Sequence, residues 1–476
     1  MEIIKTQILI IGGGAAGLNA ALNLKSNDIT LIEKNGSNSV LCPWNLMIKS
    51  KKDLLKEILE TGCNSTDSEL LDIFSKNYEN IVEDLKKTGI KFRKSNLGLI
   101  PNYTQPGKEV RKIFLNKLKE KQVKLLKGSV EKLLIDKNKK IIGVKISLFN
   151  SKKIKIFFNY LVLAAGGLGG FFKFRTGSGD SDGSILALCY EAGLKIRDLE
   201  FMMFHPFLLV DKRLPRVLVS GDLLTKMEYE NEKGEKFLSN DIADALKTNK
   251  HHRVFPKMTK EFYLQSLKSR IFGRLICSNK WFEKFKKENE FGFIFKNFKK
   301  NDLKKIELHP AFHFSIGGLV INKNSQTSQK NIYAAGEITG GLHGHNRIGG
   351  LAILEALIFG KKTAMEINKK IMKEKEIIIP EKIEGLGMLG LSDEIKNKAW
   401  EVLGPVKNKE DLNKMKSFLK NKKNATSQEK LLEKIIEICL LRNESIGAFY
   451  RQDLRKKETA RSSFLIDKKI IFKYGK

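Results

Sequence analysis

Several features are scarce in this sequence, and each absence excludes a class of protein. No run of about 18 apolar residues occurs, so no membrane-spanning helix is expected. The five cysteines lack Cys-x-x-Cys spacing, which argues against an iron–sulfur or zinc site, and we expect no metal. Their odd number, with no secretory signal at the N-terminus, favours a reducing compartment, here the cytoplasm.

Acidic residues are also few, with 54 Asp and Glu against 87 Lys and Arg, which gives a net charge of +33. Such a charge is compatible with nucleic acid or an anionic membrane surface as partners. However, the lysines are spread along amphipathic segments, and there is no Arg-rich arm or recognisable nucleic-acid module. We therefore expect no nucleic-acid partner, leave peripheral membrane contact open, and note that a positive field also steers small dianions.

The length and composition are those of a globular protein. With 476 residues, 41% of them hydrophobic, the chain can form two or three domains and a sizeable core. Glycine loops stop after the segment around residue 208 and return near residue 309, which indicates an inserted domain. The expected divisions are 1–195 and 309–375 for one domain, 196–308 for an insertion, and 376–476 for a C-terminal helical region.

The N-terminus carries a dinucleotide-binding pattern. An apolar strand, Lys5–Ile11, leads into the sequence GGGAAG, a helical segment, and a second strand that ends in Glu33. Gly12 allows the tight turn, Gly14 lets a pyrophosphate approach the backbone, and Gly17 lets the helix pack on the strand. Glu33 can accept hydrogen bonds from ribose hydroxyls. The motif alone does not separate FAD from NAD.

A second glycine-rich loop lies in the segment Asn331–Gly360. A short strand is followed by the sequence GGLHGHNRIGG and then by a helix, so unpaired N–H groups point out of the helix start and can bind an anion. Arg347 stands beside these donors, together with His343 and His345. The loop is therefore predicted to face a cofactor and an anionic substrate at once.

Five ordered motifs carry a family resemblance. GGGAAG, HFSIGG around His313, YAAGEITGGLHGHNRIGG, DLEFMMFHP around His205 and RNESIGAFYRQD near the C-terminus together resemble the flavoproteins of fumarate reductase, succinate dehydrogenase and L-aspartate oxidase. The resemblance implies an α/β fold with a Rossmann-like FAD-binding domain, an inserted α+β capping domain and a C-terminal helical region. It also implies FAD as cofactor, bound noncovalently, because no histidine occurs before His205 where covalent members carry one.

The resemblance also implies which residues contact FAD. Glu33 would bind the adenosine ribose, Glu337 would lie near the ribityl chain, and the helix start at Ala352 and Ile353 would lie near the flavin ring. Asp182 either caps a helix or touches the cofactor. The full set expected to contact FAD is Gly12, Gly14, Ala15, Ala16, Gly17, Glu33, Lys34, Val130, Ala165, Gly166, Asp182, Glu337, Ala352 and Ile353.

The substrate side is expected to bind carboxylates. Arg347, His205 and His313 are implied catalytic and substrate-binding residues, and a guanidinium matches a carboxylate bidentately. Arg253 is the nearest match to the proton-transfer arginine of the capping domain, although the family's Arg-Asp pair is absent; Arg270 and Arg274 are alternatives. The sequence VSGDLL replaces the family's RGEGG, where Ser220 is expected to donate to a carboxylate. Phe449 replaces the family's histidine in GAHYR.

These motifs predict an FAD-dependent oxidoreductase acting on a C4 dicarboxylate, with fumarate reduction or succinate oxidation as the main interpretation. L-aspartate oxidase, which forms iminoaspartate, is the alternative. The C-terminal sequence GAFYRQD favours the fumarate and succinate interpretation. A non-catalytic FAD-binding protein or electron carrier stays open, as does an electron-donor protein as partner.

Overall fold

The computed structural model describes residues 1–35, 37–95, 98–219, 221–247, 255–289, 291–371, 376–455, 457 and 461–474. Within those ranges, none of the helices combines the length and apolar character needed to cross a membrane.

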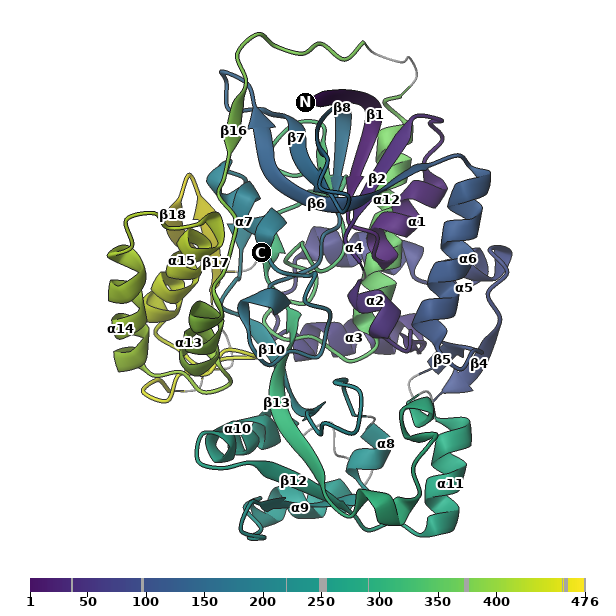
Figure 1. Ribbon diagram of the computed structural model, residues 1–476, viewed down its shortest axis with the longest axis vertical. Helices are drawn as coiled ribbons and strands as arrows, with labels where there is room; N and C mark the ends of the chain where they lie inside the picture. Colours follow the sequence, from purple (N-terminus) through teal and green to yellow (C-terminus); the bar gives the residue numbers. More distant parts are fainter. Residues whose placement is uncertain are drawn as a thin grey trace.

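The largest sheet forms the centre of the first lobe (Figure 1). Five of its strands are parallel in the spatial order β6 (Lys124–Ile135), β2 (Ile29–Glu33), β1 (Glu2–Ile11), β8 (Lys153–Leu163) and β15 (Ile332–Ala334). β7 (Ile141–Leu148) runs antiparallel between β6 and β8, and β16 (Glu384–Leu386) pairs with β6. The inner strands are almost continuously apolar, as expected for parallel strands covered on both faces.

Helices and two smaller sheets complete this lobe. The helices are α1 (Ala15–Asn23), α2 (Asn38–Leu41), α3 (Lys51–Thr61), α4 (Ser68–Asn77), α5 (Ile81–Lys87), α6 (Pro106–Glu120), α7 (Ser184–Glu191) and α12 (Leu351–Asn368). One small sheet consists of β3 (Leu46–Met47), β4 (Phe92–Ser95) and β5 (Gly98–Pro101). The other contains β9 (Ile196–Arg197), β14 (Gly318–Leu319) and the C-terminal hairpin β17 (Ser462–Ile466) and β18 (Lys469–Lys473).

The capping lobe lies below the first lobe in Figure 1 and has a hydrophobic core of its own. Its sheet has the order β10 (Met202–Leu209), β13 (Ile306–Ser315), β12 (Ile271–Leu275) and β11 (Met227–Asn231). Its helices are α8 (Gly221–Leu224), α9 (Asn240–Lys247), α10 (Phe255–Ser266) and α11 (Asn279–Glu288). β10 and β13 pass between the cores: Met202 and Phe312 are buried in the first, Phe207 and Leu308 in the second.

The C-terminal region packs on the side of the first lobe with helices α13 (Asp393–Leu403), α14 (Lys409–Lys420) and α15 (Ser427–Leu441). Its last part is not helical but forms the β17–β18 hairpin. The predicted α/β fold class is confirmed by these layers.

Several local predictions differ from the structure. The helical pattern over residues 67–88 predicts one helix, but the structure has two, α4 and α5, with Tyr78 between them. The apolar runs 123–127 and 130–135 predict two strands, but the structure has one continuous strand there, β6. The expected strand 216–219 is reduced to one bridge between Leu208 and Leu218. The helix predicted at the end of the segment 331–360 is longer than expected, because α12 continues through Gly360 to Asn368.

The close packing of α1 on α12 explains why α12 tolerates a glycine in its interior. A Cβ added at Gly360 would lie 2.5 Å from the carbonyl oxygen of Ala16. No real Cβ contact is that short, so the helices approach each other only because Gly360 has no side chain.

We expect Gly360→Ala to destabilise the protein by about 2 kcal/mol, because the backbone of Ala16 cannot move away at low cost. This exceeds the gain of about 1 kcal/mol that alanine has over glycine in a helix. Thermal unfolding measures the effect, with Gly349→Ala as control, because a Cβ there meets nothing within 4 Å. A melting temperature equal to or above wild type for Gly360→Ala would contradict the packing argument.

Candidate active site

One cavity of about 1790 Å³ runs between the carboxyl ends of the parallel strands and the capping lobe. It is lined by segments far apart in the sequence, including both glycine-rich loops. The predicted site residues on its wall are Gly12, Gly14, Ala15, Ala16, Glu33, Lys34, Val130, Ala165, Gly166, Asp182, His205, His313, Glu337, Arg347, Ala352 and Ile353.

The N-terminal loop leaves the backbone of the α1 start open to the cavity. Gly12 has φ +115°, and a Cβ there would lie 2.1 Å from the carbonyl oxygen of Ala164. Gly17 lies behind the wall, where an added Cβ would be 1.9 Å from the carbonyl oxygen of Gly12. No side chain caps the helix at Gly14, so its first N–H groups are available to an anion.

Glu33 ends β2 with its side chain buried and paired. Arg111 of α6 donates from Nη2 to Oε2 of Glu33 at 2.5 Å and from Nη1 to the carbonyl oxygen of Gly13 at 2.5 Å. The guanidinium thus ties the end of β2 to the first glycine loop and fixes the carboxylate at the cavity. Sequence reasoning did not identify Arg111, because no local pattern links position 111 to position 33.

Asp182 bonds at the start of a helix and also lines the cavity. Its Oδ1 accepts a hydrogen bond from the backbone N–H of Ser184, the first residue of α7 (3.0 Å), although Gly183 is the N-cap residue of that helix. Its Oδ2 forms an ion pair with Lys34 at 2.6 Å, and both residues line the cavity. The pair connects the segment after β2 with the start of α7.

Glu337 lies on the cavity wall and is partly buried. Its Oε1 accepts from the backbone N–H of Ser315 at 3.0 Å, and its Oε2 accepts from Asn38 at 3.3 Å. Burial raises the pKa of this carboxyl to about 7 in spite of these hydrogen bonds. Asn38 is a second residue that sequence reasoning missed; its segment, predicted to be irregular, contains the short helix α2.

Arg347 is the most unusual charged group on the wall. Its side chain is 6% exposed, and its donors reach only the carbonyl oxygen of Ile348 (3.0 Å) and the sulfur of Met203 (3.5 Å). The guanidinium lies 4.5 Å from the ring centre of Phe314, and its Nε–H has no acceptor. Burial lowers the pKa of Arg347. A buried cation without a carboxylate partner in the described part of the chain is suited to bind an anion.

His205 and His313 lie beside Arg347 on the two strands that connect the lobes. Their ring centres are 5.7 Å apart, and His313 Nδ1 shares a hydrogen bond of 2.8 Å with the hydroxyl of Thr176. Burial, and then the charges of Arg347 and His205, lower the pKa of His313 well below its ordinary value. His313 is therefore neutral at pH 7 and offers hydrogen bonds but no charge.

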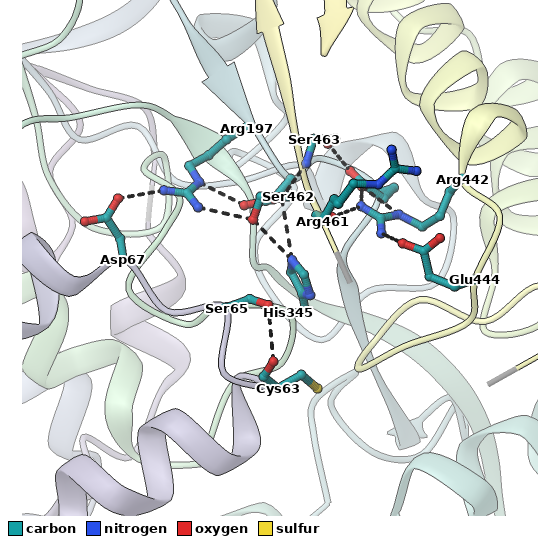
Figure 2. A network of polar contacts seen from close by, with 12 residues as sticks. Cys63, Ser65, Asp67, Arg197, His345, Arg442, Glu444, Arg461, Ser462 and Ser463 are labelled. Atoms are coloured by element: carbon teal, nitrogen blue, oxygen red, sulfur yellow. Dashed lines mark hydrogen bonds and ion pairs between the residues drawn. The ribbon is translucent and has the colours of Figure 1, made fainter. Parts of the chain in front are cut away.

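The other two histidines of the Arg347 loop do not face the cavity, contrary to the expectation from the sequence. His343 Nε2 bonds to Glu355 at 2.9 Å. His345 stacks on Phe201 with ring centres 4.1 Å apart and bonds to Ser462 of β17 at 3.2 Å (Figure 2). Burial lowers the pKa of His345 to about 3, so it is neutral. Both side chains hold the loop in place.

Figure 2 shows the polar network that surrounds His345. Arg442 forms a fully buried ion pair with Glu200, and Ser463 donates to the same carboxylate at 2.7 Å. Arg197 donates to the hydroxyl of Ser462 at 3.3 Å. The hairpin strand β17 is therefore bonded both to Arg197 and, through Ser463, to Glu200. This network anchors the segments that lead into His205 and Arg347.

Two predicted residues, Ser220 and Arg253, lie outside the described residues. The alternatives to Arg253 do not reach the cavity: Arg270 pairs with Glu232 and Arg274 pairs with Glu228, on the exposed side of the capping lobe.

Comparison with known proteins agrees with this geometry. A family model described as an FAD binding domain matches residues 7–353. The chain is 27% identical to the L-aspartate oxidase of Saccharolobus solfataricus, over 94% of this chain and 97% of that protein. It is 26% identical to the L-aspartate oxidase of Pyrococcus horikoshii, over 97% and 99% of the two chains. The solved quinol fumarate reductase of E. coli has a TM-score of 0.80 at 18% identity, with 100% and 97% of the chains covered.

The chain therefore belongs to the FAD-binding flavoproteins. It is a flavin-dependent oxidoreductase related to L-aspartate oxidase and to the fumarate reductase flavoproteins. The cavity fits FAD: two uncapped helix starts, at Gly14 and Gly350, and the cradle at Gly12 face it, and Glu33 stands at the end of β2.

We expect Arg111→Met to weaken FAD binding about ten- to a hundredfold, because hydrogen bonds to a charged group contribute about 1.5–3 kcal/mol and Glu33 loses its fixed position. Titration of apoprotein with FAD, followed by flavin fluorescence, measures the dissociation constant. Lys112→Met is the matched control, since Lys112 is exposed on the same helix. Equal affinity in the two variants would remove Arg111 from the cofactor site.

Proposed function

We propose that this protein oxidises L-aspartate to iminoaspartate, with FAD as the hydride acceptor. The single observation that supports a carboxylate substrate is the buried Arg347 guanidinium on the cavity wall, with an Nε–H that has no acceptor. The choice among dicarboxylates follows the sequence relatives, since several matches over nearly the whole chain are named L-aspartate oxidase. Their names favour the alternative over the fumarate and succinate interpretation that the motifs suggested.

The residues of this chain supply binding and orientation. Arg347 binds one substrate carboxylate with its fork of N–H donors, and the imidazole of His205 and the neutral imidazole of His313 hydrogen-bond to the same region. FAD, when bound, supplies the acceptor for the hydride that leaves the substrate Cα, while the amino group loses a proton as the C=N bond forms. Closure of the capping lobe excludes water from this exchange. Arg253 and Ser220 remain proposals for proton transfer and carboxylate binding.

Fumarate reduction is the second candidate. It is supported by the motif GAFYRQD and by a fold that matches quinol fumarate reductase. A non-catalytic FAD-binding role would not explain why the guanidinium of Arg347 is buried on the cavity wall with an unsatisfied Nε–H. The cytoplasmic compartment, an electron-donor protein and peripheral membrane contact stay predictions from the sequence.

An anaerobic experiment separates these functions. We expect L-aspartate to bleach the oxidised flavin at about 450 nm, and readmitted air to restore the colour with formation of hydrogen peroxide. In the fumarate reductase case, L-aspartate leaves the flavin oxidised, and fumarate reoxidises chemically reduced protein without air. If neither compound changes the flavin spectrum, the protein is not a dicarboxylate oxidoreductase.

We expect Arg347→Ala to lower kcat/KM for L-aspartate about 10²–10³-fold, because truncation of a charge that pairs with a buried ligand costs several kcal/mol. FAD content should not change, since Arg347 lies on the substrate side of the cavity. Arg347→Lys should recover only part of the activity, because an ammonium cannot bind a carboxylate with a planar fork. Turnover within threefold of wild type in Arg347→Ala would contradict its assignment.

A further inference from the structure

Thr176 lies on the cavity wall beside His313 and has no role in the proposed reaction so far. Its hydroxyl shares the 2.8 Å hydrogen bond with Nδ1 of His313, which lines the same cavity. In the part of the chain that the structure describes, no hydrogen bond occupies Nε2, the other ring nitrogen of His313. Nε2 is therefore the nitrogen that can meet a ligand, and the position of the ring proton decides whether it donates or accepts.

Backbone hydrogen bonds hold the segment of Thr176 in place. The N–H of Thr176 donates to the carbonyl oxygen of Phe312 in β13 at 2.9 Å, directly before His313. Two residues further on, the N–H of Ser178 donates to Oδ1 of Asn38 at 2.8 Å. Because the segment is bonded on both sides of Thr176, the hydroxyl reaches Nδ1 of His313 from a fixed position.

The hydroxyl of Thr176 is the donor in this hydrogen bond. Among the described residues, Nδ1 of His313 is the one hydrogen-bond partner of that hydroxyl. If Nδ1 carried the ring proton, it would donate to the hydroxyl oxygen, and the hydroxyl hydrogen would have no acceptor in the described part of the chain. When the hydroxyl donates instead, both groups are satisfied, and the neutral imidazole keeps its proton on Nε2.

His205 has the same tautomer for a separate reason. The backbone N–H of Phe207 donates to Nδ1 of His205 at 3.2 Å. A backbone N–H can only donate, so Nδ1 accepts and the proton of this imidazole lies on Nε2. The ring centres of His205 and His313 are 5.7 Å apart, so two imidazoles with the same tautomer lie together on the wall.

We propose that Thr176 is a positioning residue that keeps His313 in the Nε2–H tautomer, so that His313 donates a hydrogen bond to a substrate carboxylate. A carboxylate only accepts hydrogen bonds, whereas an ammonium group only donates them. A carboxylate of L-aspartate, and not its amino group, therefore faces His313, and His313 is not the base that removes the amino proton. This inference rests on the proposed function, since it assigns the orientation of the substrate in the same cavity.

Nitrogen-15 NMR of the oxidised holoenzyme with labelled histidine tests the tautomer directly. A protonated and an unprotonated ring nitrogen have well-separated chemical shifts, and the variant His313→Gln identifies the signals of this residue. We expect Nε2 of His313 to carry the proton in the wild-type protein. In Thr176→Val the two nitrogen signals should move toward each other, because both tautomers are then populated. A wild-type His313 with its proton on Nδ1 would overturn the proposal.

Succinate binding measures the consequence for the substrate site without turnover. Succinate is titrated into the oxidised holoenzyme, and the change in flavin absorbance gives the dissociation constant. We expect Thr176→Val, which removes the hydroxyl but keeps the branched shape, to weaken binding about tenfold. Thr176→Ser keeps the hydroxyl and should stay within about threefold of wild type. Thr61→Val is the matched control, because Thr61 lines the same cavity and does not bond to His313.

The outcomes separate this inference from the proposed function. Unchanged succinate binding in Thr176→Val, or an equal loss in Thr176→Ser, contradicts the role of the hydroxyl. If L-aspartate is not oxidised but the tautomer and succinate binding depend on the hydroxyl as expected, the proposed reaction fails and the positioning role of Thr176 stands. If the wild-type protein does not bind succinate, the donor role of His313 is refuted.

Discussion

The contact between α1 and α12 is the constraint on which the site depends. Because Gly360 has no side chain, its helix approaches the backbone of Ala16, and the two helix starts face one cavity. Each start presents unpaired N–H groups, and each is uncapped by a side chain. Segments more than 300 residues apart in the chain thereby form one anion-binding groove.

The positions of His205 and His313 depend on the antiparallel strands β10 and β13, which join the two lobes. β10 and β13 begin and end in different hydrophobic cores, so His205 and His313 are fixed at the level where the lobes meet. The loop of Arg347 is held from behind by His345, which bonds to the C-terminal hairpin rather than to a ligand. Rigid support of this kind keeps a binding group in position without contact to the substrate.

Electrostatics distinguishes the groups on the wall. Burial keeps His313 neutral and brings the pKa of Glu337 to about 7, whereas Arg347 retains its charge because guanidinium has so high a pKa. This part of the cavity wall thus combines a buried permanent cation, Arg347, with the neutral imidazole of His313.

The sequence determined the fold class and, through the family resemblance, the cofactor, and most of the site residues that it suggested lie on the cavity wall. Glycine loops between strand and helix have few alternative structures, so Gly12, Gly14, Glu33 and Arg347 could be identified from local pattern. The orientation of His343 and His345 could not, because a histidine beside an arginine in sequence can point to either side of a loop.

Only the tertiary structure decided the long-range partners. Arg111 reaches Glu33 across 78 positions, and His345 reaches Ser462 of the C-terminal hairpin. No periodicity or spacing encodes such pairs, since they depend on how helices and lobes pack. The sequence specified the glycine turns through local backbone chemistry, while packing decided which charges share the cavity.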